Sequence, residues 1–121
     1  MAVVDTVLTI GTAYTLDAQD ESTPPLSCGD VAHIALIALR FDGSWSGTLT
    51  FQGGAIINGT YVWDPILATN LNSGATATTS TGGASADELW RIDLVGRLAC
   101  RVYATTVSAG SVTATFNITR G

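Results

Sequence analysis

The chain has 121 residues, of which 46% are hydrophobic and only 12% are charged. Disordered chains combine low hydrophobicity with high net charge, so this composition excludes general disorder and predicts a single domain over residues 1–121. Five arginines against ten acids give a net charge of −5. Because binding to phosphate backbones needs clustered cations, no nucleic-acid partner is expected.

The N-terminal part combines a predicted strand with a predicted acidic loop. Apolar side chains alternate along Val3–Ile10, which favours a strand. Asp17–Gly29 contains two prolines and several acids, and it is predicted to be a long exposed loop. Residues 1–30 are therefore expected to form an N-terminal arm and acidic loop. No lysine or arginine precedes the first apolar run, so no cleaved secretory signal is expected and synthesis in a cytoplasm is predicted.

The middle of the chain predicts further strands and a hairpin. His33–Phe41 is apolar on both faces, which fits a covered central strand or a short buried helix, and we favour the strand. Its apolar stretch is too short to span a bilayer, so no membrane segment is expected. The turn at residues 42–44 and the alternating Thr48–Gln52 segment that follows predict a hairpin, with His33–Phe41 as its first strand. After a pair of glycines, another strand is marked by Ile57, Tyr61 and Trp63.

The C-terminal part predicts a loop, three strands and a second hairpin. Asn70–Ala86 is rich in small polar residues and is predicted to be an exposed loop. In Leu89–Val95, every second side chain from Trp90 onward is expected to point inward. Apolar residues also alternate through Leu98–Ala104 and Val112–Ile118, and a short turn-prone stretch between them predicts a hairpin. The whole pattern predicts an all-β fold, an antiparallel β-sandwich or jelly roll of about eight strands.

Charge is unevenly distributed along the chain. Residues 1–39 contain five acids and no cation and sum to −5, whereas the five acids and five arginines that follow cancel. A surface with so few charges is expected to be partly covered by neighbours, and arginine is the cation favoured in interfaces. We expect a homo-oligomer, with a trimer favoured, in which N-terminal acids of one copy meet arginines of the next. The candidate interface residues are Asp17, Asp20, Glu21, Arg91, Arg97, Arg101 and Arg120.

The tryptophans divide between core and surface. Trp45 and Trp90 are expected to pack in the core. Trp63, which precedes Asp64 and Pro65, is a further candidate interface residue because an aromatic side chain near a strand end can act as a surface anchor. Exposed aromatic rings also stack on sugars, so a carbohydrate-binding module is an alternative function.

Catalysis and metal binding have little support in the sequence. His33 is the only histidine. Ser27, Cys28 and Asp30 lie near it, but closeness in sequence does not establish the geometry of a catalytic triad, so no enzyme and no cofactor is expected. Cys28 and Cys100 lack the spacing and the second histidine of a zinc site, and no metal is expected. Both cysteines are predicted to be free thiols in a reducing cytoplasm, and a disulfide between them is the alternative.

Four segments carry a resemblance to a known group of proteins. They are Gly43–Gly53 (GSWSGTLTFQG), Leu89–Gly96 (LWRIDLVG), Arg101–Ala104 (RVYA) and Ser108–Thr115 (SAGSVTAT). In this order and spacing they resemble small β-sandwich structural proteins of tailed bacteriophages. The resemblance covers residues 40–121 and implies a virion component without catalytic residues.

The resemblance implies a structural role in a phage particle. The protein would then be made in the cytoplasm of a bacterial host and located in the virion. We expect a capsid decoration, or cement, protein that binds the major capsid protein and stabilises the assembled shell, because a compact domain with an acidic N-terminal third can act as a clamp across capsid subunits. A tail, baseplate or fibre component, with tail proteins as partners, is the alternative.

Overall fold

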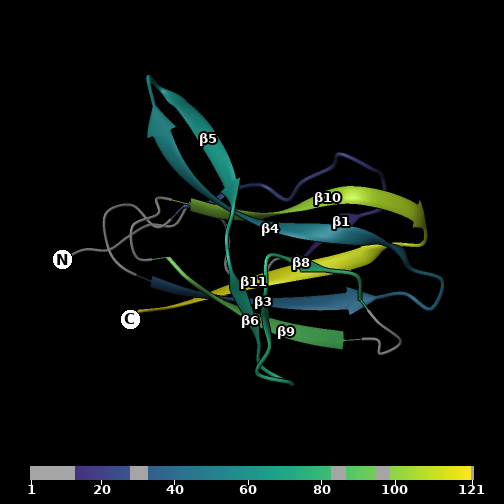
Figure 1. Cartoon of the computed structure of the whole chain (residues 1–121). Helices are drawn as coiled ribbons and strands as arrows, with labels where there is room; N and C mark the ends of the chain where they lie inside the picture. The colour runs from purple at the N-terminus through teal and green to yellow at the C-terminus, as the bar shows by residue number, and fades with distance from the viewer. Residues whose placement is uncertain (1–12, 28–32, 83–86, 95–98, 121) are drawn as a thin grey trace.

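The computed structural model describes residues 13–27, 33–82, 87–94 and 99–120, and it places them in two antiparallel sheets packed face to face (Figure 1). The predicted all-β sandwich is confirmed. The described residues form eleven strands, more than the eight or so expected. No helix in this part of the chain is long and apolar enough to cross a membrane.

One sheet has six strands and the other has five. The six-stranded sheet has the order β1-β11-β3-β9-β6-β7, and the five-stranded sheet has the order β2-β10-β4-β5, with β8 paired to β4. In chain order the strands are β1 (Ala13–Leu16), β2 (Leu26–Ser27), β3 (His33–Phe41), β4 (Ser46–Ile57), β5 (Thr60–Pro65), β6 (Ala68–Asn70), β7 (Thr76–Ala77), β8 (Thr79–Ser80), β9 (Asp87–Asp93), β10 (Ala99–Ala109) and β11 (Val112–Arg120).

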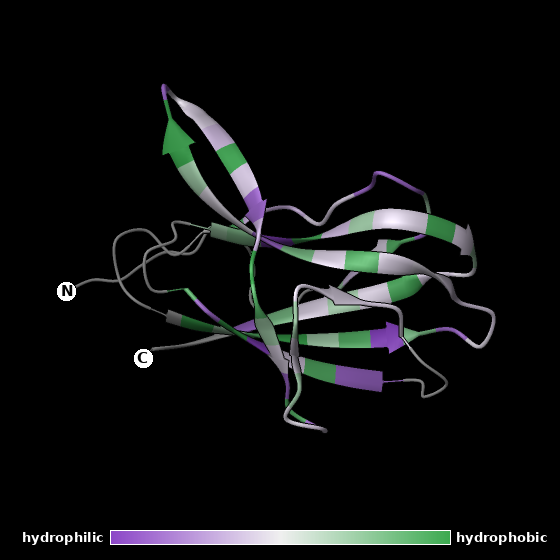
Figure 2. Ribbon diagram, in the orientation of Figure 1, coloured by the Kyte–Doolittle hydropathy of each residue, from purple (hydrophilic) through white to green (hydrophobic). Residues whose placement is uncertain are grey.

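The core lies between the sheets and consists of the inward side chains of the long strands. Figure 2 shows apolar residues alternating with more polar ones along these strands, as the period of two requires. Phe51 of β4 and Phe116 of β11 are fully buried, and Trp90 of β9 is only 4% exposed, as predicted. Cys100 of β10 is also fully buried. The rings of Phe51 and Trp90, one from each sheet, have centroids 4.8 Å apart.

The ambiguous segment His33–Phe41 is a strand, as predicted. It pairs with β11 on one side and β9 on the other, so it is a central strand of the six-stranded sheet. Its inward side chains, from Ala35 to Phe41, are buried, whereas the outward Ile34, Leu36 and Ala38 are half-buried. The second apolar face of the segment therefore lies on the outside of the sandwich.

Both predicted hairpins are wrong, because each pair of strands divides between the two sheets. The turn at residues 42–45 joins β3 to β4, yet β3 pairs with β9 and β11 while β4 pairs with β5, β8 and β10. Residues 110–111 join β10 to β11, which likewise belong to different sheets. We call these two connections the arches. Alternation identifies the inward face of a strand but not its neighbour, so two strands joined by a turn can pack across the core instead of pairing.

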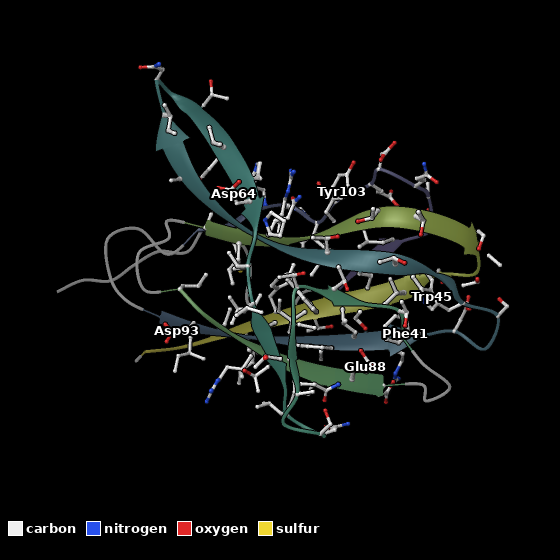
Figure 3. The ribbon with its side chains drawn as sticks, viewed as in Figure 1. Phe41, Trp45, Asp64, Glu88, Asp93 and Tyr103 are labelled. Carbon is white, nitrogen blue, oxygen red and sulfur yellow. The ribbon has the colours of Figure 1, made fainter. Side chains whose placement is uncertain are left out.

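Asp42 links the two arches by hydrogen bonds. Its Oδ1 accepts from the backbone N and the hydroxyl of Ser44, at 3.0 and 3.1 Å. Its Oδ2 accepts from the backbone N and the hydroxyl of Ser111, at 2.9 and 3.1 Å. Phe41 and Trp45, whose ring centroids are 5.5 Å apart, lie at this same end of the sandwich (Figure 3). The arches therefore form one connected corner.

The pKa of Asp42 predicts that acid weakens this corner. Partial desolvation of the carboxyl acts to raise its pKa, but the hydrogen bonds from Ser44 and Ser111 outweigh desolvation and hold the pKa below its usual value. Such a carboxyl stabilises the fold above its unfolded pKa of about 3.9 and loses this contribution as the pH falls through the folded value. We expect the free energy of unfolding, measured by urea denaturation, to fall below about pH 4, and to fall less in Asp42→Asn.

The control for this pH dependence is Asp64→Asn, which removes an exposed carboxyl group on β5, far from the arches (Figure 3). This variant is expected to keep the wild-type decrease in stability. Equal decreases in the wild type and in Asp42→Asn would contradict the role given to Asp42.

A true hairpin joins β4 to β5 and extends beyond the body of the sandwich (Figure 1). At its turn, Asn58 and Gly59 have φ values of 54° and 81°, as in a two-residue type I′ turn. This hairpin is not among the expected ones, although Asn-Gly between apolar residues is a strong signal for it. The sequence analysis placed Ile57 in the same strand as Tyr61 and Trp63. In the structure it belongs instead to β4, where it pairs with Thr60.

The two predicted loops contain short strands and part of the core. In Asp17–Gly29, Leu26 of β2 is fully buried, and the buried Thr23 accepts a hydrogen bond from the backbone of β10. In Asn70–Ala86, β7 pairs with β6 and β8 pairs with β4. Strands of two or three residues are too short to show alternation, which is why the sequence did not predict them. The predicted strand Val3–Ile10 lies outside the described residues.

Candidate functional site

Four side chains form a row on the outer face of the five-stranded sheet. We call this set the aromatic row; in order, it consists of Tyr61, Trp63, Arg101 and Tyr103. The rings of Tyr61 and Trp63 are stacked with centroids 5.1 Å apart. The guanidinium carbon of Arg101 lies 4.3 Å from the centroid of the Trp63 ring and 5.5 Å from that of Tyr103. Because a cation is attracted to the face of an aromatic ring, the row fixes β5 against β10 across β4.

The strand register explains the order of the row. Tyr61 lies two residues before Trp63 on β5. Across β4, Arg101 of β10 aligns with the β5 position two residues after Trp63. Below the ring, a Cβ at Gly54 would come within 2.8 Å of Trp63, so the ring occupies space that this glycine leaves free. Trp63 is thus enclosed on two sides and from below, which leaves little of its ring face for a sugar to stack on.

The aromatic row is connected to the N-terminal acidic loop. The hydroxyl of Tyr103 donates to Asp20 Oδ1 at 2.7 Å, and Arg101 Nε donates to Gln52 Oε1 at 2.7 Å. The hydrogen bond to Asp20 raises the pKa of Tyr103, and desolvation lowers the pKa of Arg101. Within one chain, Tyr103 therefore contacts both Asp20 and Arg101, whereas the sequence-based hypothesis pairs acids and arginines between copies.

The other candidate interface residues lie apart from the row. Glu21 Oε1 accepts from the backbone N of Asp17 at 2.9 Å, which closes a turn within the acidic loop. Arg91 is exposed on β9, in the other sheet. Arg97 and the side chain of Arg120 lie outside the described part of the chain. Of the candidates, Trp63 and Arg101 belong to the row, and Asp20 contacts it through the hydroxyl of Tyr103.

A groove of about 570 Å³ lies on the outer face of the six-stranded sheet. Short side chains from three adjacent strands line it, at Ala13, Ala38, Thr113 and Thr115. Leu89, 37% exposed, lines it as well, together with Arg40 and Asp87, whose Nε and Oδ1 are 3.2 Å apart. Asp87 raises the pKa of Arg40. The sequence did not predict this groove, because its residues come from strands whose pairing the alternation does not reveal.

The tip of the β4–β5 hairpin, residues 55–62, is apolar and exposed. Ile56 is 51% exposed, Ile57 57% and Val62 43%. Figure 2 shows apolar residues on both strands of this hairpin. Ile57 continues the inward side of β4 past the end of the core, and no described residue covers it there. No charged residue occurs between positions 53 and 63. The hairpin tip and the groove are therefore the two surfaces best suited to bind another protein.

Most residues considered for catalysis fall outside the described side chains. Cys28 and Asp30 are not described, and of Ser27 and His33 only the backbone is, in β2 and β3. Among the side chains that the structure does describe, no group of three His, Cys, Asp or Glu residues is arranged to hold a metal ion.

Two solved structures share this fold. The SPBc2 prophage-derived protein YomS matches with a TM-score of 0.64 and 13% identity, over 95% of this chain and 100% of YomS. The PBSX exported protein XepA matches with a TM-score of 0.61 and 18% identity over 93% of this chain, which spans only 39% of XepA. No protein-family model and no curated protein sequence matches the chain. The expected resemblance to phage β-sandwich proteins is thus confirmed for the fold, which this chain shares with prophage-derived proteins.

Proposed function

We propose that the chain is a structural protein of a bacteriophage particle, and specifically a capsid decoration protein that binds the assembled shell. The fold shared with two prophage-derived proteins supports a phage origin. The low charge of the chain, 12% of its residues, supports a protein whose surface is partly covered by neighbours. The proposal assigns the chain no catalytic activity and no cofactor.

The observation that carries this proposal is the placement of the exposed apolar side chains. Of the large hydrophobic residues exposed in the described chain, three are on the hairpin tip, Leu89 lines the groove, and Leu71 precedes Asn72 of the groove lining. Only Leu67 of this described set lies elsewhere. Large exposed apolar side chains that gather in patches mark surfaces that bind other proteins, whereas scattered ones need no explanation.

Exposed apolar surfaces of this kind fit a protein that assembles with neighbouring proteins in a particle. We propose that it forms a homo-oligomer, with a trimer favoured, and that the oligomer binds the major capsid protein. Exposed ion pairs would each contribute only about 0.2 to 1 kcal/mol to these contacts, so apolar burial supplies most of the affinity.

The test is to locate the chain on intact particles. Particles produced from the genome that encodes the chain are purified on a density gradient and labelled with a gold-conjugated antibody against it. We expect the label on the heads, with one or more copies of the chain for each cluster of capsid subunits. Label confined to tails would overturn the capsid assignment in favour of a tail, baseplate or fibre component. Purified particles without label would overturn the structural role itself.

The carbohydrate-binding alternative has less support. A sugar needs an open aromatic face, and the Trp63 ring lies between Tyr61 and Arg101. A glycan array probed with the labelled protein tests this alternative, because binding that Trp63→Ala abolishes would favour it.

A further inference from the structure

The hairpin tip and the groove belong to different sheets of the sandwich. The hairpin extends the five-stranded sheet (Figure 1), whereas the groove is lined by residues of the six-stranded sheet. The core separates the two surfaces within one molecule. Any contact between them is therefore a contact between two copies of the chain.

The two surfaces have matching chemistry. The hairpin tip presents Ile56, Ile57 and Val62, all with branched apolar side chains. Four of the ten residues that line the groove are alanine or threonine, whose side chains are short enough to leave room for larger side chains from outside. Its volume of about 570 Å³ lies within the range of protein sites that enclose a ligand, roughly 300 to 1,000 Å³.

We propose that the hairpin tip of one copy docks in the groove of the next copy, in a head-to-tail contact. This inference rests on the self-assembly included in the proposed function and names the surfaces that carry it. A head-to-tail contact closes into a ring when the rotation between copies divides a full turn, and a rotation of about 120° gives a trimer.

Charge favours a second copy as the occupant. Two copies of a chain with net charge −5 repel each other, so they can pack closely only where charge is absent or balanced. The hairpin tip carries no charged residue, and in the groove Arg40 and Asp87 balance each other. Glu88, which also lines the groove, has its carboxylate engaged by the Ser80 hydroxyl at 2.6 Å and by Trp90 Nε1 at 2.9 Å.

Sedimentation velocity of the purified chain tests the contact with one variant on each surface. Ile57→Asp places a charge on the hairpin tip, and Ala38→Arg fills the groove. We expect each to weaken self-association by at least about tenfold, as the loss of a central apolar contact does. Thr115→Arg is a second groove variant, at an outward position on a different strand, in case Ala38→Arg folds poorly. The charge-matched controls are Leu67→Asp and Leu67→Arg, at a 64% exposed site outside both surfaces.

Mixing the two variants distinguishes a head-to-tail contact from a symmetric one. Ile57→Asp keeps an intact groove and Ala38→Arg keeps an intact hairpin tip, so a mixture is expected to form a one-to-one heterodimer and nothing larger. If hairpins paired with hairpins, Ala38→Arg would still assemble alone. If grooves paired with grooves, Ile57→Asp would still assemble alone. Either result would overturn the proposal.

A wild-type chain that stays monomeric at high micromolar concentration would also overturn the proposed contact. The same holds if Ile57→Asp and Ala38→Arg assemble like the Leu67 controls. These outcomes are separate from those of the particle experiment. A chain that assembles through hairpin and groove but is absent from purified particles keeps the contact and loses the proposed function. A chain found on heads that never self-associates keeps the capsid role and loses the contact.

Discussion

Gly110→Ala is expected to destabilise the fold by about 2 to 5 kcal/mol. Gly110 has a φ of 74°, in the left-handed region, where an L-residue costs about 1 to 2 kcal/mol. Its added Cβ would also lie against Asp42 Oδ1 and within 2.7 Å of the backbone of Trp45. Accommodating the extra methyl group in such a crowded site typically costs about 1 to 3 kcal/mol more. Because these neighbours belong to the other arch, the clash would separate the two arches that Asp42 joins.

The matched control is Gly43→Ala, in the arch between β3 and β4. A Cβ at this position has no neighbour within 4 Å, and its φ is not in the left-handed region. The free energy of unfolding, from urea denaturation at neutral pH, is expected to change by less than about 0.5 kcal/mol. If Gly110→Ala were as mild as Gly43→Ala, the close packing of the two arches would be refuted.

Alternation in the sequence predicted which side chains enter the core, but not which strands pair. Trp90 is buried as expected, and Phe51 and Phe116 are buried within segments whose alternation the sequence showed, because the period of two is a local property of each strand. The choice of neighbour depends on contacts between segments distant in sequence. Strand β10, for example, pairs with β4, more than forty residues earlier, and not with the adjacent β11. Both predicted hairpins failed for this reason.

The candidate site was predicted only in part. Asp20, Trp63 and Arg101 were predicted as interface residues; the structure places Trp63 and Arg101 in the aromatic row and Asp20 in contact with its Tyr103. Their link depends on Tyr103, whose hydroxyl reaches Asp20 across 83 positions of sequence. Segregation of charge along the chain cannot distinguish a contact within one molecule from a contact between two, since both bring acids near arginines.

The hairpin tip could have been found from the sequence. Ile56 and Ile57 directly precede Asn58-Gly59, so two large apolar residues stand beside a turn that must be near the surface. Turns are usually flanked by polar residues at their exposed ends, and this exception marks an exposed apolar surface. The groove offers no comparable signal, because it exists only once β1, β3, β9 and β11 are side by side.

Phe51→Ala is expected to lower the free energy of unfolding by about 3 to 5 kcal/mol. The side chain is fully buried on β4, and its ring lies 4.8 Å from Trp90 of the opposite sheet. The substitution removes apolar burial, leaves a cavity between the sheets and also breaks an aromatic contact worth about 0.5 to 1.5 kcal/mol. Chemical denaturation followed by tryptophan fluorescence measures this loss.

Leu67→Ala serves as the control for Phe51→Ala, because Leu67 is 64% exposed and its truncation is expected to cost less than about 0.5 kcal/mol. The backbone of Phe51 also accepts from Ile66 N and donates to the carbonyl of Thr78, both at 2.9 Å, and the substitution leaves these bonds in place. The loss can therefore be assigned to the ring and not to the strand. A cost below about 1 kcal/mol, less than the usual range for a buried phenylalanine, would show that this ring does not hold the two sheets together.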